Sequence, residues 1–234
     1  MKKGFTLAEV LITLGVIGVV AAITIPNLIQ NYKKHVLENR LKQTVSILQQ
    51  AVVRSSVDNG TPDTWGVNGF DSTIFEVYIK PYLSVVKTCT NSSDASCNIN
   101  FNYQGTGSGK WVDARYAKKY ILNNGSAIIY YPAGNYGHRR GLFLIVPFNT
   151  NKNLIYGKNI FTFNFIIEDN KTYSITSKRD YDLTLDFCKQ INKTTLYDYC
   201  QNGTGGAGFA DGITCSAIIE CNGWKFPDDY PIRL

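Results

Sequence analysis

The 234-residue sequence contains only two histidines, one methionine and no cysteine before residue 89. It has no GxSxG, HExxH, P-loop or CxxC pattern, so the usual marks of serine hydrolases, zinc proteases, nucleotide-binding loops and thioredoxin-like redox sites are missing. Its two histidines, His35 and His138, are expected to be a solvated helix residue and part of an exposed basic loop. We therefore expect no enzyme activity, no cofactor and no metal site.

The composition excludes two further classes. Hydrophobic residues make up 44% of the chain and charged residues 18%, which excludes a wholly disordered protein. The net charge of +6 is only a weak indication of a nucleic-acid partner. Fifteen tyrosines and twelve phenylalanines favour a body rich in β-structure.

All six cysteines follow residue 88: Cys89, Cys97, Cys188, Cys200, Cys215 and Cys221. This even number predicts disulfides formed outside the cytoplasm, with Cys89–Cys97 closing a short polar loop. If segment 215–221 is a helix, its two cysteines lie ~9 Å apart along the axis, too far for a bridge. We then expect Cys200–Cys215 and Cys188–Cys221. The rival pairing, Cys188–Cys200 with Cys215–Cys221, requires that segment not to be helical.

The strongest pattern lies in the first thirty residues. Lys2 and Lys3 precede an apolar run of 21 residues from Phe5 to Ile25, which as a helix would span ~31 Å, about the thickness of a bilayer core. The positive charges predict that the start stays cytoplasmic and the rest faces outward. Glu9 interrupts the run at a cost of ~3 kcal/mol. Because no basic residue follows within the run, we expect its counter-charge from another chain or from a new N-terminus.

The segment Lys2-Lys3-Gly4 followed by Phe5-Thr6-Leu7-Ala8-Glu9 resembles the prepilin cleavage and methylation motif of type IV pilins and type II secretion pseudopilins. The resemblance covers about 25 residues and implies cleavage between Gly4 and Phe5, then N-methylation of Phe5. Glu9 becomes the fifth mature residue, where the family's glutamate sits. Pro26 becomes the twenty-second, where many members carry a helix-kinking proline.

The resemblance also implies a location and partners. The subunit would start in the bacterial inner membrane as a single-pass protein with its head outside the cytoplasm, and would then enter a pilus or periplasmic pseudopilus. Its partners would be other copies or related pilins, prepilin peptidase and an inner-membrane assembly platform, with Glu9 pairing with the Phe5 ammonium of a neighbour. The alternative is a minor pilin whose head binds DNA or a surface ligand. The candidate contacts for that role are basic: Lys118, Lys119, Arg139 and Arg140.

Apolar residues continue beyond Pro26 at helical spacing: Leu37, Leu41, Val45, Leu48 and Val52. This stripe predicts one amphipathic helix from about residue 6 to about residue 56, stopped by the turn residues at 58–60. We expect a leader at 1–4, a helix at 5–56 with its transmembrane part at 5–25, and a disulfide-containing globular head at 57–234.

Strand patterns occur at 127–131, 142–148, 161–167 and 172–176, which together predict an antiparallel meander of about four strands. Alternation within 161–167 predicts a half-buried strand. Segment 75–83 is expected to be a short helix or strand ended by Pro81. The expected fold class is α+β, with a long N-terminal helix packed on a head that contains a small antiparallel sheet, as in pilins.

Overall fold

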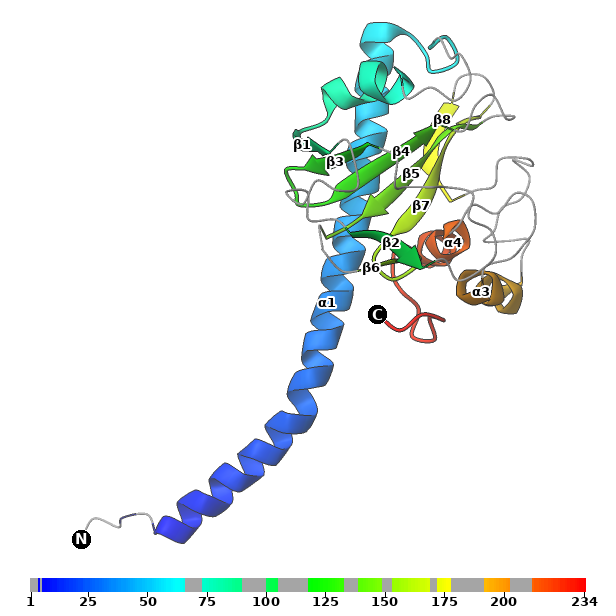
Figure 1. Cartoon of the computed structure of the whole chain (residues 1–234). Coiled ribbons are helices and arrows are strands. Elements are labelled where there is room, and N and C mark those ends of the chain that lie inside the picture. Colours follow the sequence, from blue (N-terminus) through cyan, green and yellow to red (C-terminus); the bar gives the residue numbers. More distant parts are fainter. Residues whose placement is uncertain are drawn as a thin grey trace. The chain divides into compact units, whose positions relative to one another are not determined.

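A computed structural model of the chain describes residues 4, 6–65, 73–89, 100–104, 118–132, 139–148, 153–168, 172–177, 192–202 and 212–234. The chain divides into two compact units, residues 1–37 and 38–234 (Figure 1). The first unit contains the beginning of helix α1 (Leu7–Asn59), and the second, called the head below, contains the rest of α1 and every other described element.

Helix α1 follows the expected pattern of its side chains. Within the head, Leu41, Val45, Leu48 and Val52 are all buried, as the apolar stripe predicts. The helix ends three residues later than expected, where Gly60 adopts a φ of +78° that favours glycine over other residues. The indole nitrogen of the buried Trp65 donates to the Gly60 carbonyl at 2.8 Å and so fixes this end.

The main sheet has six antiparallel strands in the order β1-β3-β4-β5-β7-β8. These strands are β1 (Val85–Cys89), β3 (Lys119–Leu122), β4 (Ala127–Pro132), β5 (Arg139–Val146), β7 (Phe161–Glu168) and β8 (Thr172–Thr176). Two further strands, β2 (Asn100–Gln104) and β6 (Asn153–Ile155), pair with each other in parallel. The expected meander is confirmed and is extended by β1 and β3, which confirms the α+β class.

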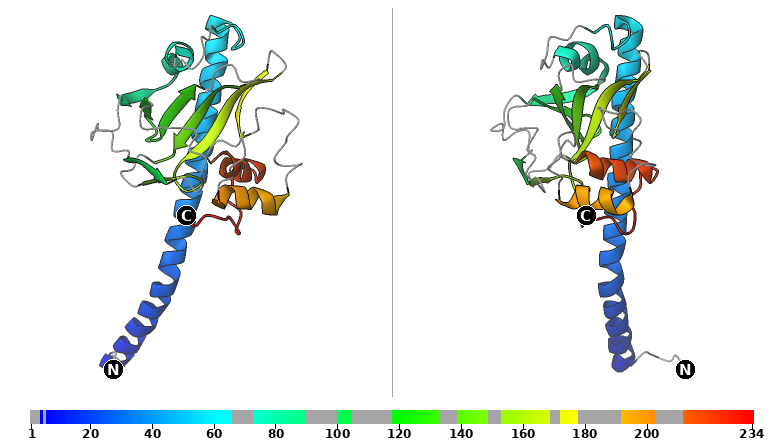
Figure 2. Two further views of the ribbon diagram at one scale, coloured as in Figure 1. Left: turned by 45° about the vertical axis from the view of Figure 1, so that its right-hand side comes forward. Right: turned by 90° about the vertical axis from the view of Figure 1, so that its right-hand side faces the viewer.

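The central strands are buried on both faces, so the prediction of a half-buried strand at 161–167 is wrong. Part of α1 lies across one face of the sheet (Figures 1 and 2). On the other face, Leu154, Tyr156 and Ile160 belong to one apolar cluster with residues of β4 and β5. Thr162 and Asn164 of β7 share that face and are therefore only 1% and 0% exposed.

Segment 75–83 contains two short helical turns. The π-helix η1 (Ile74–Ile79) is followed by the 3-10 helix η2 (Lys80–Tyr82), and Pro81 lies inside η2 rather than ending the segment. Phe75 is fully buried, with its ring centroid 6.0 Å from that of Phe143 in β5. The π-helix therefore anchors this connection in the aromatic core of the head.

Polar contacts fix α1 to the edge of the sheet. The Gln49 side-chain amide donates to the Tyr173 carbonyl at 3.0 Å and accepts from the Ile175 backbone N–H at 2.9 Å. Both groups belong to β8, which is an edge strand. A side chain of the helix thus takes two backbone positions that a neighbouring strand would otherwise use.

The C-terminal region consists of α3 (Lys193–Asn202), α4 (Ile213–Cys221) and the tail that follows. Cys200 and Cys215 form a disulfide with a Cα–Cα distance of 4.8 Å, the pairing expected for a helical segment 215–221. Cys89 takes part in a disulfide as well, and so does Cys221. Because Cys97 and Cys188 lie outside the described residues, the pairings Cys89–Cys97 and Cys188–Cys221 remain predictions.

The tail returns to the helix and to the sheet. The Phe226 backbone N–H donates to the buried Glu38 carboxylate of α1 at 2.8 Å, and the Tyr230 hydroxyl donates to the Gly157 carbonyl at 2.8 Å. Burial raises the pKa of Tyr230, which is therefore a neutral donor at physiological pH. These contacts tie the chain end to both layers of the head.

Candidate processing and assembly site

The residues around the expected cleavage point precede the helix. Gly4 is exposed, α1 begins only at Leu7, and a β-carbon added at Gly4 would meet nothing within 4 Å. Phe5 lies outside the described residues. The peptide at Gly4 is thus not held in a helical hydrogen-bond ladder, which is the condition a peptidase needs to bind backbone in an extended form.

Glu9 has a hydrogen-bonding partner within its own chain, which the sequence analysis had missed. Its Oε2 atom accepts from the Thr6 backbone N–H at 2.8 Å and from the Thr6 hydroxyl at 2.7 Å, while the Glu9 N–H donates to that hydroxyl at 3.3 Å. This reciprocal arrangement is a capping box, which satisfies N–H groups left free in the first helical turn. The Thr-x-x-Glu spacing is a sequence signal that predicts it.

The capping box occupies only one of the two carboxylate oxygens. Glu9 Oε1 accepts no hydrogen bond from the residues that the structure describes. The acid also lies in the first turn of α1, where the positive end of the helix dipole favours a negative charge. The geometry therefore holds a carboxylate at the helix start with one oxygen still open to a donor from elsewhere.

The side chains that follow form an exposed apolar surface. Leu11, Leu14, Ile17 and Ile23 are each 60–65% exposed, and an 18-residue window has a mean hydropathy of 2.3 with none of its residues buried. By length and composition this is the one candidate membrane span among the described residues. Such a surface in water would be strongly unfavourable, so it points to lipid or to other apolar helices as its surroundings.

The polar side chains in this stretch are satisfied within the helix. The Thr13 hydroxyl donates to the Val10 carbonyl at 3.0 Å, and the Thr24 hydroxyl donates to the Val20 carbonyl at 2.9 Å. Pro26 lies inside α1, which continues on both sides of it. Because hydroxyls without partners would be costly in hydrocarbon, these internal bonds suit a segment that enters a bilayer.

The basic residues proposed for DNA contact are arranged differently from the expectation. The Lys119 side chain is fully buried, and the Lys118 ammonium lies 2.8 Å from Glu76 Oε1. The side chains of Arg139 and Arg140, as well as residue His138, lie outside the described part of the chain. His35 is exposed on α1. Lys118 and Lys119 therefore do not form a free basic pair on the surface.

Within the described residues, no group of three or more His, Cys, Asp or Glu side chains is placed to hold a metal ion. Glu76 binds Lys80, Lys118 and the Tyr120 hydroxyl at 2.7–2.8 Å. These contacts make Glu76 part of the framework of the head.

Comparison with protein-family models gives two matches that meet near Pro26. Residues 1–25 match the prokaryotic N-terminal methylation motif, and residues 27–234 match a family described as a family of unknown function (DUF6613). Neither the search of curated proteins nor the search of solved structures finds a match.

Proposed function

The chain belongs to the family of unknown function DUF6613 and begins with the prokaryotic N-terminal methylation motif, and from this premise we propose that it is a structural subunit of a filament, cleaved after Gly4 and polymerised through α1. The motif indicates a type IV pilin-like or pseudopilin-like subunit, and the long helix followed by an antiparallel sheet is a pilin-like architecture. The proposed filament is a type IV pilus or a type II secretion pseudopilus.

The observation that carries the proposal is the state of the first part of α1. Its large apolar side chains are exposed from Leu7 to Ile29, yet its threonine hydroxyls and its one acid are hydrogen-bonded within the same chain. A helix of this kind is suited first to lipid and then to a bundle of equivalent helices. A subunit that moves from the inner membrane into a filament would meet these two environments in this order.

Cleavage and assembly are linked through Glu9. Prepilin peptidase would remove residues 1–4 and leave a new, methylated ammonium at Phe5, next to Thr6. Glu9 Oε2 is engaged by Thr6 of its own chain, so Oε1 is the atom that would receive the ammonium of a second subunit. In an apolar environment this ion pair stabilises contact between subunits, because either charge left unpaired is heavily penalised.

Two substitutions test this order of events. Glu9→Gln keeps the side-chain size and an acceptor for Thr6 but removes the charge, so cleavage should persist while incorporation into filaments falls about tenfold or more. Gly4→Ser should instead leave an uncleaved precursor in the membrane. Mass spectrometry of the mature N-terminus reports cleavage, and immunoblots of sheared filaments report assembly.

A matched control removes a different polar group from the same helix. Thr13→Val deletes a hydroxyl that bonds only its own backbone among the described residues, and filaments should form normally. Normal filament yield with Glu9→Gln would contradict the ion-pair mechanism, and a mature-length product from Gly4→Ser would contradict the cleavage site.

The alternative role, a minor pilin that binds DNA, has less support. Two of its four basic residues, Lys118 and Lys119, are respectively ion-paired and buried. If DNA binds the full chain in detergent with an affinity that falls steeply as salt rises, this alternative is favoured. We expect no such salt-dependent binding.

A further inference from the structure

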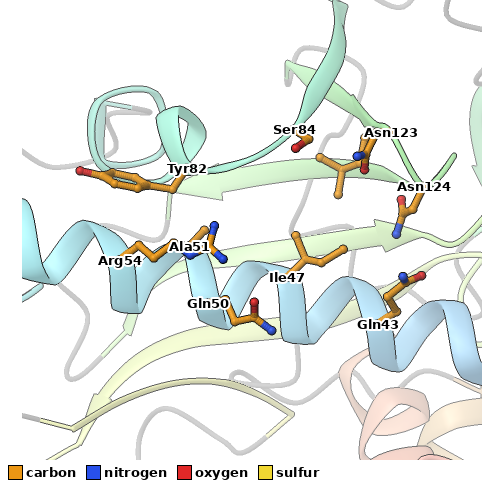
Figure 3. Close-up of a pocket in the computed structure, with 10 residues that line it drawn as sticks. Gln43, Ile47, Gln50, Ala51, Arg54, Tyr82, Ser84, Asn123 and Asn124 are labelled. Atoms are coloured by element: carbon orange, nitrogen blue, oxygen red, sulfur yellow. The ribbon is translucent and has the colours of Figure 1, made fainter.

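A groove of about 290 Å³ lies on the head (Figure 3). It runs between the outer side of α1, the connection from η2 to β1, and the turn between β3 and β4. All of its lining residues belong to the head. The proposed assembly through the start of α1 does not use it.

The groove combines an apolar lining with hydrogen-bonding side chains. Ile47 of α1 is the partly exposed apolar side chain of the lining, and Ala51 and Leu122 lie behind it at only 1% and 2% exposure. The amides of Gln43 and Asn123 are also part of the lining, and both side chains are exposed. Each amide offers a donor and an acceptor in one plane, which suits neighbouring hydroxyl groups on a ligand.

Of the residues that the structure describes, Arg54 is the one ionised side chain that lines the groove, and its guanidinium lies along α1 beside Ala51 (Figure 3). No Asp or Glu of the described part of the chain lines the groove. Among the described residues, Arg54 has no hydrogen-bond or ion-pair partner. Its planar fork of donors is therefore open to a carboxylate, which it can bind through two parallel hydrogen bonds.

The walls of the groove are held by backbone and side-chain contacts. The Asn123 backbone N–H donates to the Ser84 carbonyl at 3.0 Å and ties the β3–β4 turn to the connection after η2. The Asn124 amide accepts from the Ser126 N–H at 3.0 Å and donates to the Thr44 hydroxyl at 3.4 Å. A ligand would meet walls that are already ordered, which lowers the entropy cost of binding.

We propose that this groove binds a carboxylated sugar residue of an acidic glycan. A pyranose ring presents an apolar face of C–H groups to Ile47, hydroxyls to the amides, and a carboxylate to Arg54. The volume is at the low end of small-ligand sites, which run from about 300 to 1,000 Å³, and so fits one ring better than a longer segment. The head would then attach the filament subunit to an acidic polysaccharide surface.

The test is a calorimetric titration of the full chain, in detergent micelles, with trigalacturonate. The matched probe is its methyl ester, which keeps the ring and hydroxyls and lacks the charge. We expect the acid to bind, the ester to bind at least about tenfold more weakly, and Arg54→Gln to reduce affinity for the acid by a similar factor. Asn123→Ala should cause a smaller loss.

The control variant is Arg233→Gln, which removes one exposed positive charge outside the groove and should leave binding unchanged. Thermal unfolding of each variant checks that the head is intact. Equal binding of acid and ester, full competition by inorganic sulfate at equal ionic strength, unchanged affinity in Arg54→Gln, or no binding of trigalacturonate would each overturn the proposal.

Discussion

The two parts of helix α1 share one continuous backbone but differ in the exposure and the hydrogen bonding of their side chains. In the first unit, large apolar side chains such as Leu14 and Ile17 are about 60% exposed, and hydroxyls bond carbonyls of their own helix. In the head, Leu41 and Leu48 are fully buried, and polar residues of α1 bond the sheet instead. The difference shows that helical propensity sets the secondary structure, while the pattern of side chains sets the surroundings of each part.

The largest expected effect is the loss of stability on truncating a buried leucine of α1, and it should occur in only one of the two parts. Leu48→Ala removes a fully buried side chain and should lower the free energy of unfolding of the head by about 3–5 kcal/mol, because it leaves a cavity. Leu14→Ala, its matched control, should leave that free energy unchanged. Tryptophan fluorescence of the full chain during denaturation in detergent measures both. Equal destabilisation by the two variants would break the comparison.

The second-largest effect should come from the disulfide between Cys200 and Cys215, which lies wholly within the head. Replacing both Cys200 and Cys215 with Ser opens a loop with a sequence separation of 15 and should lower the free energy of unfolding by about 2–4 kcal/mol. Membrane insertion of the first part of α1 should be unaffected, as measured by carbonate extraction. A loss of insertion in this variant would show that the two units depend on each other.

The free energy of unfolding of the head should depend on pH through Glu76. Burial of Glu76 raises its pKa, but hydrogen bonds from Lys118, Lys80 and Tyr120 outweigh this and lower the pKa from 4.5 to about 2. A lowered pKa means that the stabilisation is complete above about pH 4.5 and is lost as the pH falls towards 2. Glu76→Gln should cost about 1–3 kcal/mol at pH 7 and flatten the acid limb of the stability curve.

The control for this prediction is Asp63→Asn, which changes an exposed acid in the same unit. Its stability curve between pH 2 and pH 7 should follow that of the unaltered chain. A Glu76→Gln variant with the same acid limb as the unaltered chain would contradict the assigned role of Glu76.

The smallest expected effect on the free energy of unfolding comes from removing one polar side chain from each part of α1. Gln49→Leu leaves the Tyr173 carbonyl and the Ile175 N–H without this partner and should cost about 1–2 kcal/mol in the unfolding of the head. Thr24→Val removes a hydroxyl that bonds only Val20 among the described residues and should cost the head nothing. A head destabilised by Thr24→Val would show that the first part of α1 supports it.

The sequence predicted the parts of the fold that have a strong period. The apolar stripe of α1 and the strands at 127–131 and 172–176 were recognisable because their patterns extend over whole elements. Strands β1 (VVKTC) and β3 (KYIL) each contain a lysine and show no regular alternation of apolar and polar residues, so no strand pattern was recognisable there. Pairing with neighbouring strands, which is a long-range effect, makes them part of the sheet.

The sequence pattern also did not predict that β7 is buried on both faces. Thr162 and Asn164 alternate with phenylalanines as in a strand with one wet face, but a cluster that includes Tyr156 and Ile160 covers that face. At the candidate site, the apolar run and Glu9 were readable, whereas the Thr6 contact was missed because only charged partners had been considered. The groove beside Arg54 brings together three segments distant in sequence, which no local pattern reveals.

The Gln49 contact has a consequence for how copies of this protein can join. The Gln49 amide occupies the Tyr173 carbonyl and the Ile175 N–H of β8, so a second head cannot extend the sheet through these two backbone positions. Strand-by-strand aggregation through these positions of β8 is therefore disfavoured, and the proposed filament would have to grow through other surfaces.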